Sequence, residues 1–307
     1  MIHSFTVTNH LGDSIQLDMG EPDISGFLIK SVTGLGPAKA TVNTTEVATN
    51  DGSMFNSARL SQRNIVFQFV FVHSTSGESI EDIRQKSYKY FPVKKNVTIY
   101  IRTDNRYVKT VGYVESNEPT IFSSQEGSQV SIICPDPYFY SAGEDGSNTT
   151  DFYSIEPMLE FPYSNESTTE KLTMLSQINT TNEDVIVYKG DTDIGVTINI
   201  HAIGEASNIS IYNRKTHESM YIDTSKFGSS LTAGLIAGDS ITICTLKGNK
   251  SITLTRNGTT YNILNCLGKN PDWFVLSTGD NVFLFTAETG MLNLQIQIQN
   301  ETIYEGV

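Results

Sequence analysis

Short alternating runs of apolar and polar residues dominate this chain. In Ile65 to Val72, Val97 to Arg102 and Leu292 to Ile298, at least every second residue is apolar. A period of two places the apolar side chains on one face of a strand. Turn-forming residues separate the runs, and Thr103 to Arg106 and Arg256 to Thr259 each predict the turn of a hairpin. The pattern therefore predicts a mostly antiparallel, all-β chain.

One segment departs from the alternating pattern. Ser79, with an acidic residue three positions later, is typical of the first residues of a helix. Ile80 and Ile83 then fall near one helical face, and a proline follows the segment. The sequence predicts a single short helix over about residues 79–91, with its apolar residues packed on the first sheet.

A long polar stretch separates Gly34 from Arg63. Its centre, Asn50 to Gly52, predicts a turn between two weakly apolar arms, so that residues 37–63 form a hairpin. Such an extension is too polar to be buried in its own domain, and it lies either in solvent or on another molecule. An arm of about ten residues spans roughly 30 Å at ~3.3 Å per residue, which is enough to reach a neighbouring copy. The sequence thus predicts a protruding hairpin with a role in assembly.

The boundary between two domains is marked by composition. Pro135 and Pro137 stiffen the end of the first half, and the Gly, Ser, Asn and Asp residues after them read as a linker. A chain of 307 residues is long enough for two ordinary domains. We expect a first domain over 1–140, a linker over 141–151 and a second domain over 152–307.

The charge and the cysteine content of the chain exclude some classes of function. The chain has 34 acidic and 21 basic residues, a net charge of -13, whereas nucleic-acid binding relies on clustered Lys and Arg. We therefore expect no specific nucleic-acid binding. Polar residues near the N-terminus and the lack of about 18 consecutive apolar residues argue against a signal peptide and membrane insertion. An odd number of cysteines without a CxxC pair predicts buried free thiols at Cys134, Cys244 and Cys266.

Catalytic motifs are not recognisable in the sequence. It lacks the zinc-protease HExxH motif, the GxSxG nucleophile motif, the phosphate-binding loop and a cysteine with a convincing histidine partner. Its acidic clusters lack the ligand spacing of a calcium loop, and no pair of carboxylates indicates glycoside hydrolysis. We expect no enzymatic activity, no cofactor and no metal.

Several segments of the sequence carry a resemblance to a known family. The first half contains GFLIKSVTGLG (Gly26 to Gly36), DGSMFNSARLSQRNIVFQFVF (Asp51 to Phe71), KSYKYFP followed by KNVTIYIRTDNR, and CPDPYFY. The second half contains EFPY (Glu160 to Tyr163), NISIYNRKTHESMYID, the turn Ala237-Gly238-Asp239, and PDWFVLSTGDNVFLF (Pro271 to Phe285). In their order and spacing, these segments resemble the distal tail protein family of phages with long non-contractile tails.

The resemblance implies an architecture and a role. The first domain would be a β-sandwich or split barrel that assembles into a hexameric ring, with the hairpin of residues 37–63 as a belt on the adjacent subunit. The second domain would be a galectin-like β-sandwich. The ring would join the major tail tube protein to the tail-tip protein (tail-associated lysin) and leave a central channel for DNA. Expected locations are the tail tip of the virion and, during assembly, the host cytoplasm. The expected belt residues are Val42, Thr44, Val47, Met54, Phe55 and Leu60.

An alternative function is a carbohydrate-binding adhesion module that contacts host-surface glycans through the second domain. Receptor-binding proteins are the other expected contact of this domain. Trp273, the one tryptophan, offers an aromatic ring that would stack on a sugar, and Arg214 would bind sugar hydroxyls. Both residues fall in strands and turns that carry the family resemblance, so a structural role of Trp273 against the second core is the competing interpretation.

Overall fold

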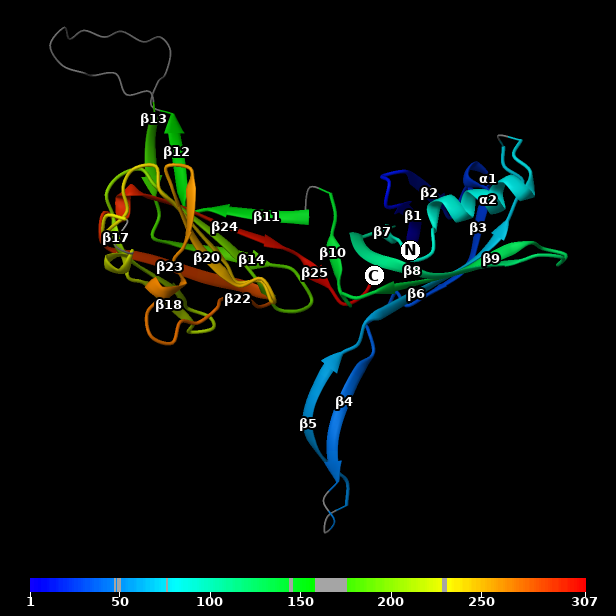
Figure 1. Cartoon of the computed structure of the whole chain (residues 1–307), viewed down its shortest axis with the longest axis horizontal. Coiled ribbons are helices and arrows are strands. Elements are labelled where there is room, and N and C mark those ends of the chain that lie inside the picture. Colours follow the sequence, from blue (N-terminus) through cyan, green and yellow to red (C-terminus); the bar gives the residue numbers. More distant parts are fainter. Residues whose placement is uncertain (47, 49–50, 76, 144–145, 158–175, 228–230) are drawn as a thin grey trace, which may run out of the picture. The chain divides into compact units, whose positions relative to one another are not determined.

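The computed structural model describes residues 1–46, 48, 51–75, 77–143, 146–157, 176–227 and 231–307 (Figure 1). Val47 and the EFPY segment, Glu160 to Tyr163, lie outside the described residues. Strands dominate the chain, which confirms the all-β prediction. The chain divides into unit 1, which contains Met1–Gly146 and Ile303–Val307, and unit 2, which contains Ser147–Thr302.

Unit 1 is built on one long, bent antiparallel sheet. The predicted turn at Thr103 to Arg106 joins two neighbouring strands of this sheet. Two short strands, β10 (Phe139–Ser141) and β25 (Ile303–Tyr304), extend it beside β8. Its main path is β2 (Ser14–Asp18), β1 (Ile2–Thr8), β7 (Asn96–Thr103), β8 (Tyr107–Thr120), β9 (Gly127–Cys134), β6 (Arg63–Phe71) and β3 (Phe27–Thr33).

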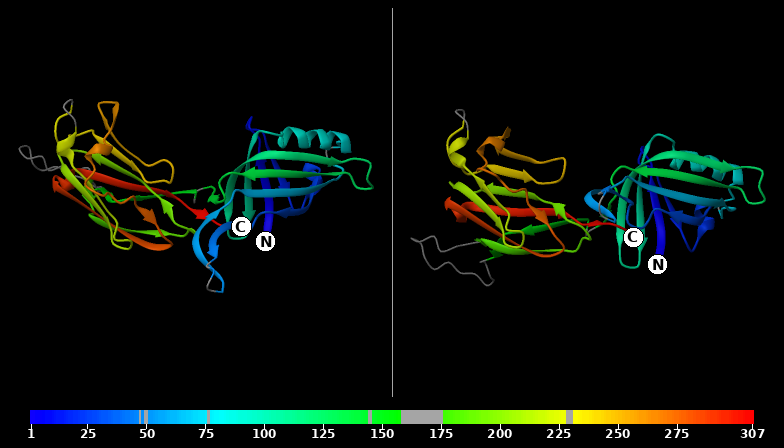
Figure 2. Two further views of the ribbon diagram at one scale, coloured as in Figure 1. Left: turned by 60° about the horizontal axis from the view of Figure 1, so that its bottom comes forward. Right: turned by 90° about the horizontal axis from the view of Figure 1, so that it is seen from below.

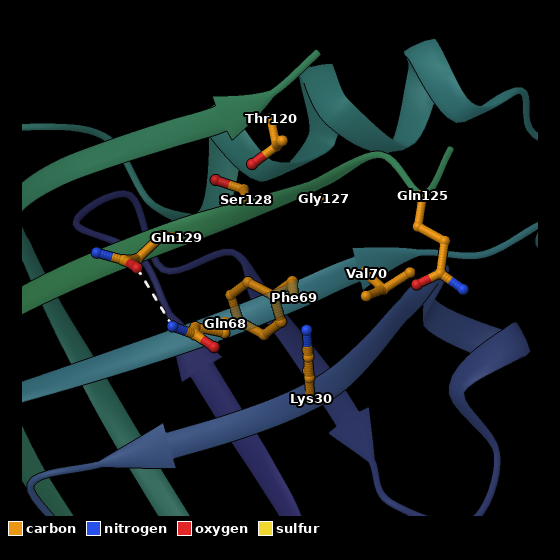
Figure 3. Close-up of a pocket in the computed structure, with 9 residues that line it drawn as sticks. All are labelled: Lys30, Gln68, Phe69, Val70, Thr120, Gln125, Gly127, Ser128 and Gln129. Carbon is orange, nitrogen blue, oxygen red and sulfur yellow. Dashed lines mark hydrogen bonds between the residues drawn. The ribbon is translucent and has the colours of Figure 1, made fainter. Parts of the chain in front are cut away.

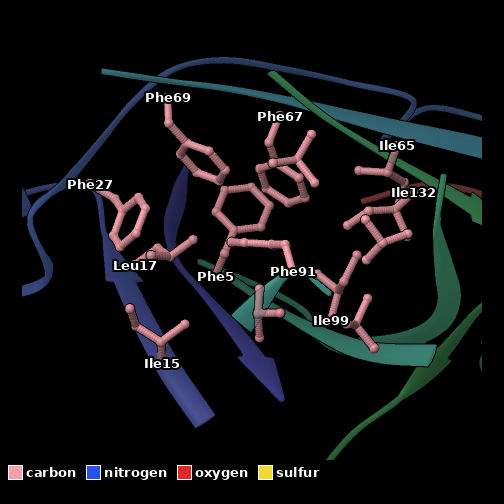
Figure 4. Packing of buried hydrophobic residues seen from close by; sticks show 14 of the residues in the cluster. Phe5, Ile15, Leu17, Phe27, Ile65, Phe67, Phe69, Phe91, Ile99 and Ile132 are labelled. Atoms are coloured by element: carbon pink, nitrogen blue, oxygen red, sulfur yellow. The ribbon is translucent and has the colours of Figure 1, made fainter. Parts of the chain in front are cut away.

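Alternation along the strands of unit 1 fills a core rich in phenylalanine (Figure 4). Phe5 and Phe67 meet edge to face with ring centroids 5.3 Å apart, and Phe27 contacts Phe69 in the same way at 5.5 Å. Such edge-to-face pairs place the positive rim of one ring against the negative face of the other. The sheet bends around this core, so its two halves enclose one set of apolar side chains.

The predicted helix is α2 (Ile80–Tyr90), and its capping box is present. Ser79 Oγ accepts a hydrogen bond from the Asp82 amide, and the Asp82 carboxylate accepts one from the Ser79 amide. Ile83 is fully buried in the unit 1 core. A second helix, α1 (Pro22–Ser25), was not predicted, because four residues are too few to show a helical period.

The end of the chain, Ile303–Val307, returns to unit 1, whereas a second domain over 152–307 was expected from the sequence. Strand β25 pairs with β10, Arg106 donates a hydrogen bond to the Gly306 carbonyl, and the Arg106 guanidinium lies 4.2 Å from the Tyr304 ring centroid. The segment expected as a linker, 141–151, is also partly strand, since it contains the end of β10 and all of β11 (Ser147–Asp151). Segments this short do not reveal their pairing partners in a sequence.

Unit 2 consists mainly of two antiparallel sheets with apolar residues between them. Phe152 meets Phe285 edge to face at 4.9 Å, and Phe274 meets Phe283 at 5.5 Å. The turn at Arg256 to Thr259 closes a hairpin, as predicted. One sheet contains β14 (Glu183–Tyr188), β23 (Gly279–Thr289), β17 (Ser207–Asn213) and β18 (Ser219–Ile222). The other contains β11, β24 (Leu294–Glu301), β16 (Thr197–Ala202), β19 (Ser240–Cys244), β20 (Ser251–Arg256) and β21 (Thr259–Asn262).

Smaller elements complete unit 2. The short pairs are β12 (Tyr153–Pro157) with β13 (Ser176–Thr180), and β15 (Ile194–Gly195) with β22 (Val275–Leu276). Single 3-10 turns are η2 (Thr224–Lys226), η3 (Leu264–Cys266) and η4 (Met291–Asn293).

All three cysteines are free thiols; Cys134 and Cys266 are buried as expected, but Cys244 is half-buried. Within the described ranges, no helix is long and apolar enough to cross a membrane.

Candidate assembly surfaces

The polar stretch between Gly34 and Arg63 forms a hairpin that projects from the body of unit 1 (Figures 1 and 2). Its strands are β4 (Ala40–Glu46) and β5 (Ser53–Leu60), which pair with each other as a separate two-stranded sheet. Every residue of both strands is exposed except Leu60, which is half-buried. The hairpin therefore contributes almost nothing to the core of unit 1.

A β-bulge in this hairpin decides which side chains share a face. Asn43 is opposite Ser57 and Thr44 is opposite Phe55, so Asn56 has no partner across the ladder. Directly opposed residues share a face, while the extra residue of a bulge reverses the alternation along its own strand. Phe55 consequently lies on the same face as Ala58. A regular strand would have placed it on the opposite face.

The bulge gives the hairpin one apolar face and one polar face. Asn43 and Asn56 donate hydrogen bonds to Ser57 and Thr45 on the polar face. Met54, opposite Thr45, is the exception, because its apolar side chain lies on that polar face. We call the other face the apolar belt face; it consists of Ala40, Val42, Thr44, Phe55, Ala58 and Leu60, with Glu46 and Ser53 at its far end.

The expected belt residues are thus divided between the two faces. Val42, Thr44, Phe55 and Leu60 belong to the apolar belt face, and Met54 does not. Val42 and Phe55 are 56% and 63% exposed, which leaves most of their apolar surface in contact with water. Their role as contact residues stays a prediction.

Arg63 fixes the root of the hairpin, a role that was not predicted from the sequence. This side chain is only 2% exposed. Its guanidinium donates hydrogen bonds to four backbone carbonyls, those of Gly34 (2.6 Å), Gly36 (2.5 Å), Pro137 (2.6 Å) and Glu305 (2.6 Å). Arg63 therefore ties together the entry to the hairpin, the exit from β9 and the returning end of the chain.

The setting of Arg63 is unusual for a buried cation. It lies 4.1 Å from the Phe139 ring centroid, and carbonyl oxygens rather than a carboxylate accept its hydrogen bonds. Burial lowers the pKa of Arg63, but an arginine remains protonated at neutral pH. Gly34 lies beside this network at φ 84°, and a Cβ there would come within 1.9 Å of the Asn64 carbonyl oxygen. The root thus requires both a glycine and an arginine. An Arg at the start of an apolar strand was the available sequence signal.

The outer face of β3, β6 and β9 carries a polar ladder (Figure 3). Ser31 donates a hydrogen bond to the Gln68 side chain at 2.9 Å, and Gln68 donates one to Gln129 at 3.3 Å. These amides border a shallow pocket of about 240 Å³, which Lys30 also lines. The lining contains amides, the Thr120 and Ser128 hydroxyls and the Lys30 ammonium, so it offers mainly hydrogen bonds.

Unit 2 contains the two residues expected to contact carbohydrate, and each has a charged neighbour. Arg214 forms an ion pair with Glu183 at 2.7 Å, at the start of β14. Trp273 is half-buried, and Lys250, just before β20, places its ammonium 5.3 Å from the ring centroid. The structure does not show these two side chains converging on one site.

Metal binding was not expected from the sequence. Among the residues that the structure describes, no group of three or more His, Cys, Asp or Glu side chains is arranged to hold a metal ion.

Comparisons with known proteins gave no match at the sequence level. No family model matches the chain. No curated protein matches it either.

Solved structures are similar at the level of the fold. The crystal structure of the phage SPP1 Dit protein, described as a paradigm of the hub adsorption apparatus in phages that infect Gram-positive bacteria, aligns with a TM-score of 0.61. The alignment covers 97% of this chain and 98% of the SPP1 protein at 12% identity. Two structures of the phage p2 baseplate in its activated conformation, with Sr and with Ca, align with TM-scores of 0.41 and 0.42. The structure with Sr is 11% identical over 97% of both chains. The structure with Ca is 12% identical over 98% of both chains. The chain therefore has the fold of the SPP1 Dit protein.

Proposed function

We propose that this chain is the structural hub subunit of a phage tail tip, in which six copies form a ring between the tail tube and the tip proteins. The observation that carries the proposal is the β4–β5 hairpin with its exposed apolar belt face. A two-stranded hairpin alone is marginally stable in water, and an exposed apolar face favours a protein partner. The fold shared with the SPP1 hub protein supports the same role.

In the proposed ring, the hairpin of each copy acts as a belt on the adjacent copy. Unit 2 would be the galectin-like domain of the hub and a docking site for receptor-binding proteins. The ring would contact the major tail tube protein on one side and the tail-associated lysin on the other. Its subunits would assemble in the host cytoplasm and be located at the tail tip of the virion.

The proposed role requires a central passage for DNA and does not require catalysis. DNA would pass through the centre of the ring, and a net charge of -13 per copy disfavours retention of its phosphates. We assign the chain no enzymatic activity. The contacts of Trp273 and Arg214 do not favour the carbohydrate-binding alternative, because Lys250 lies over the tryptophan ring and the arginine is paired with Glu183.

Removal of the hairpin tests the proposal. Deletion of Val42 to Asn56 removes most of β4, half of β5 and no residue of the unit 1 core. Size-exclusion chromatography with light scattering should show a ring for the natural chain and a folded monomer for the deletion variant. A ring that survives the deletion, or a natural chain that stays monomeric even with tail tube protein, would contradict the proposal.

A further inference from the structure

A second exposed surface with the composition of an interface lies on unit 1. It is the outer face of β7 and β8, where outward positions alternate with buried ones such as Ile99 and Val108. Tyr107, Val111 and Tyr113 on this face are 36%, 47% and 51% exposed. We call it the tyrosine face; it consists of Tyr100, Arg102, Tyr107, Lys109, Val111 and Tyr113.

The tyrosine face is preorganised. The rings of Tyr100 and Tyr107 stack with centroids 6.1 Å apart, and the Arg102 guanidinium lies 5.2 Å from the Tyr107 centroid. Tyr and Arg, together with Trp, are enriched among the residues that contribute most to binding at protein interfaces. Since neighbouring strands already hold these side chains in place, little conformational entropy remains to be lost on binding. Solubility alone does not require exposed Tyr and Arg side chains in this arrangement.

The apolar belt face matches the tyrosine face in length and character. Strand β4 and the segment from Tyr107 to Tyr113 each contain seven residues, and their six steps at ~3.3 Å span about 20 Å in both cases. Phe55 and Val42 on the hairpin would cover Val111 and the tyrosine rings, so that both surfaces lose their contact with water.

Charge indicates a direction for this contact. Glu46 lies at the far end of the apolar belt face, opposite Ser53. Arg102 and Lys109 lie at the Tyr107 end of the tyrosine face, and neither forms an ion pair with any described side chain. Placing Glu46 over that end brings Leu60, at the root of the hairpin, toward Tyr113. The opposite orientation leaves the two cations without a carboxylate.

The hairpin does not cover the tyrosine face of its own chain. Arg63 holds the hairpin root through the carbonyls of Gly34 and Gly36, and the strands extend away from the body of unit 1 (Figures 1 and 2). We propose that the tyrosine face receives the apolar belt face of a second copy, with Glu46 above Arg102 and Lys109. This inference rests on the proposed ring and names the surface on which each hairpin lies.

Disulfide trapping tests this contact. The variant pair is Val42→Cys with Val111→Cys, made in a Cys244→Ser chain because Cys244 is the one half-buried native thiol. The matched control replaces Val42→Cys with Met54→Cys, which is about equally exposed but lies on the polar face of the hairpin. A second control keeps Val42→Cys and replaces Val111→Cys with Val187→Cys, an exposed strand position of unit 2.

Assembled protein is oxidised with copper phenanthroline and run on a denaturing gel without reductant. The inference predicts a ladder of cross-linked copies for the Val42 and Val111 pair, with at least a tenfold lower yield for both controls. An intact ring with no preference for that pair would overturn the inference while leaving the ring standing. Protein that forms no ring at any concentration, with tail tube protein present, would overturn both.

Discussion

Thr44 and Phe55 lie directly opposite each other in the β4–β5 hairpin, immediately beyond the bulge at Asn56. This pairing puts the Phe55 ring on the same face as Val42 and leaves Met54 on the other face. A single unpaired residue thus determines which side of the hairpin offers an apolar surface to a partner.

Phe55 should be essential to assembly, and Met54 should not. Phe55→Ser removes an apolar side chain whose burial stabilises a contact by roughly 1.5–3 kcal/mol. A loss of about 2 kcal/mol weakens each subunit contact about 30-fold. Analytical ultracentrifugation over a concentration series should show this shift toward monomer for Phe55→Ser.

Met54→Ser is the matched control for that experiment. The two side chains are similarly exposed, at 60% and 63%, so solubility effects should be alike. Equal weakening of assembly by both substitutions would mean that the bulge does not select the contact face.

Arg63→Met should destabilise unit 1 locally. The substitution leaves four carbonyls, those of Gly34, Gly36, Pro137 and Glu305, without their buried donor. Unsatisfied buried groups cost about 1–3 kcal/mol each where water does not replace the donor, so we expect a total loss of roughly 3 kcal/mol or more. Hydrogen exchange should accelerate at the hairpin root and at residues 303–307. Unchanged protection from hydrogen exchange at both places would show that the Arg63 hydrogen bonds do not hold these segments together.

Asp239→Asn should destabilise unit 2. Asp239 and Arg256 are 1% and 6% exposed and form an ion pair at 2.5 Å. The Asp239 carboxylate also accepts a hydrogen bond from the Ile236 amide, and this ion pair raises the pKa of Arg256. Removing one charge leaves the other buried and unpaired, at a cost of about 3–5 kcal/mol. Chemical denaturation should report this loss, and Asp239→Asn combined with Arg256→Met should be less destabilised than Asp239→Asn alone.

The capping box of α2 should make unit 1 stability depend on pH. Hydrogen bonds from the Ser79 hydroxyl and amide hold the pKa of Asp82 below its ordinary value. A lowered folded-state pKa stabilises the protein above the ordinary pKa, and this stabilisation disappears as the pH falls through the folded-state value. Asp82→Ala should therefore lower the unfolding midpoint at pH 7 and have a smaller effect near pH 3. An equal effect at both pH values would show that the carboxylate charge does not matter.

The sequence revealed the features that are periodic or local. Alternation identified the strands, the Ser79 and Asp82 pair identified α2, and the polar composition around Asn50 to Gly52 identified the hairpin. The sequence also showed the turn at Ala237 to Asp239.

Features that depend on tertiary pairing were not predictable from the sequence. The bulge at Asn56 appears only when β4 and β5 are paired, and the Arg63 contacts join segments up to 242 residues apart. The Asp239 and Arg256 pair joins the residue before β19 to the end of β20, and it likewise forms only when these two strands pair. A period in the sequence reports which face a side chain takes, but not which chain segment will meet it.

Negative-stain electron microscopy of the purified protein, with tail tube protein added, tests the central claim most directly. If each hairpin is buried against the next copy, class averages will show closed rings of six subunits. Isolated single subunits at every concentration would contradict the account.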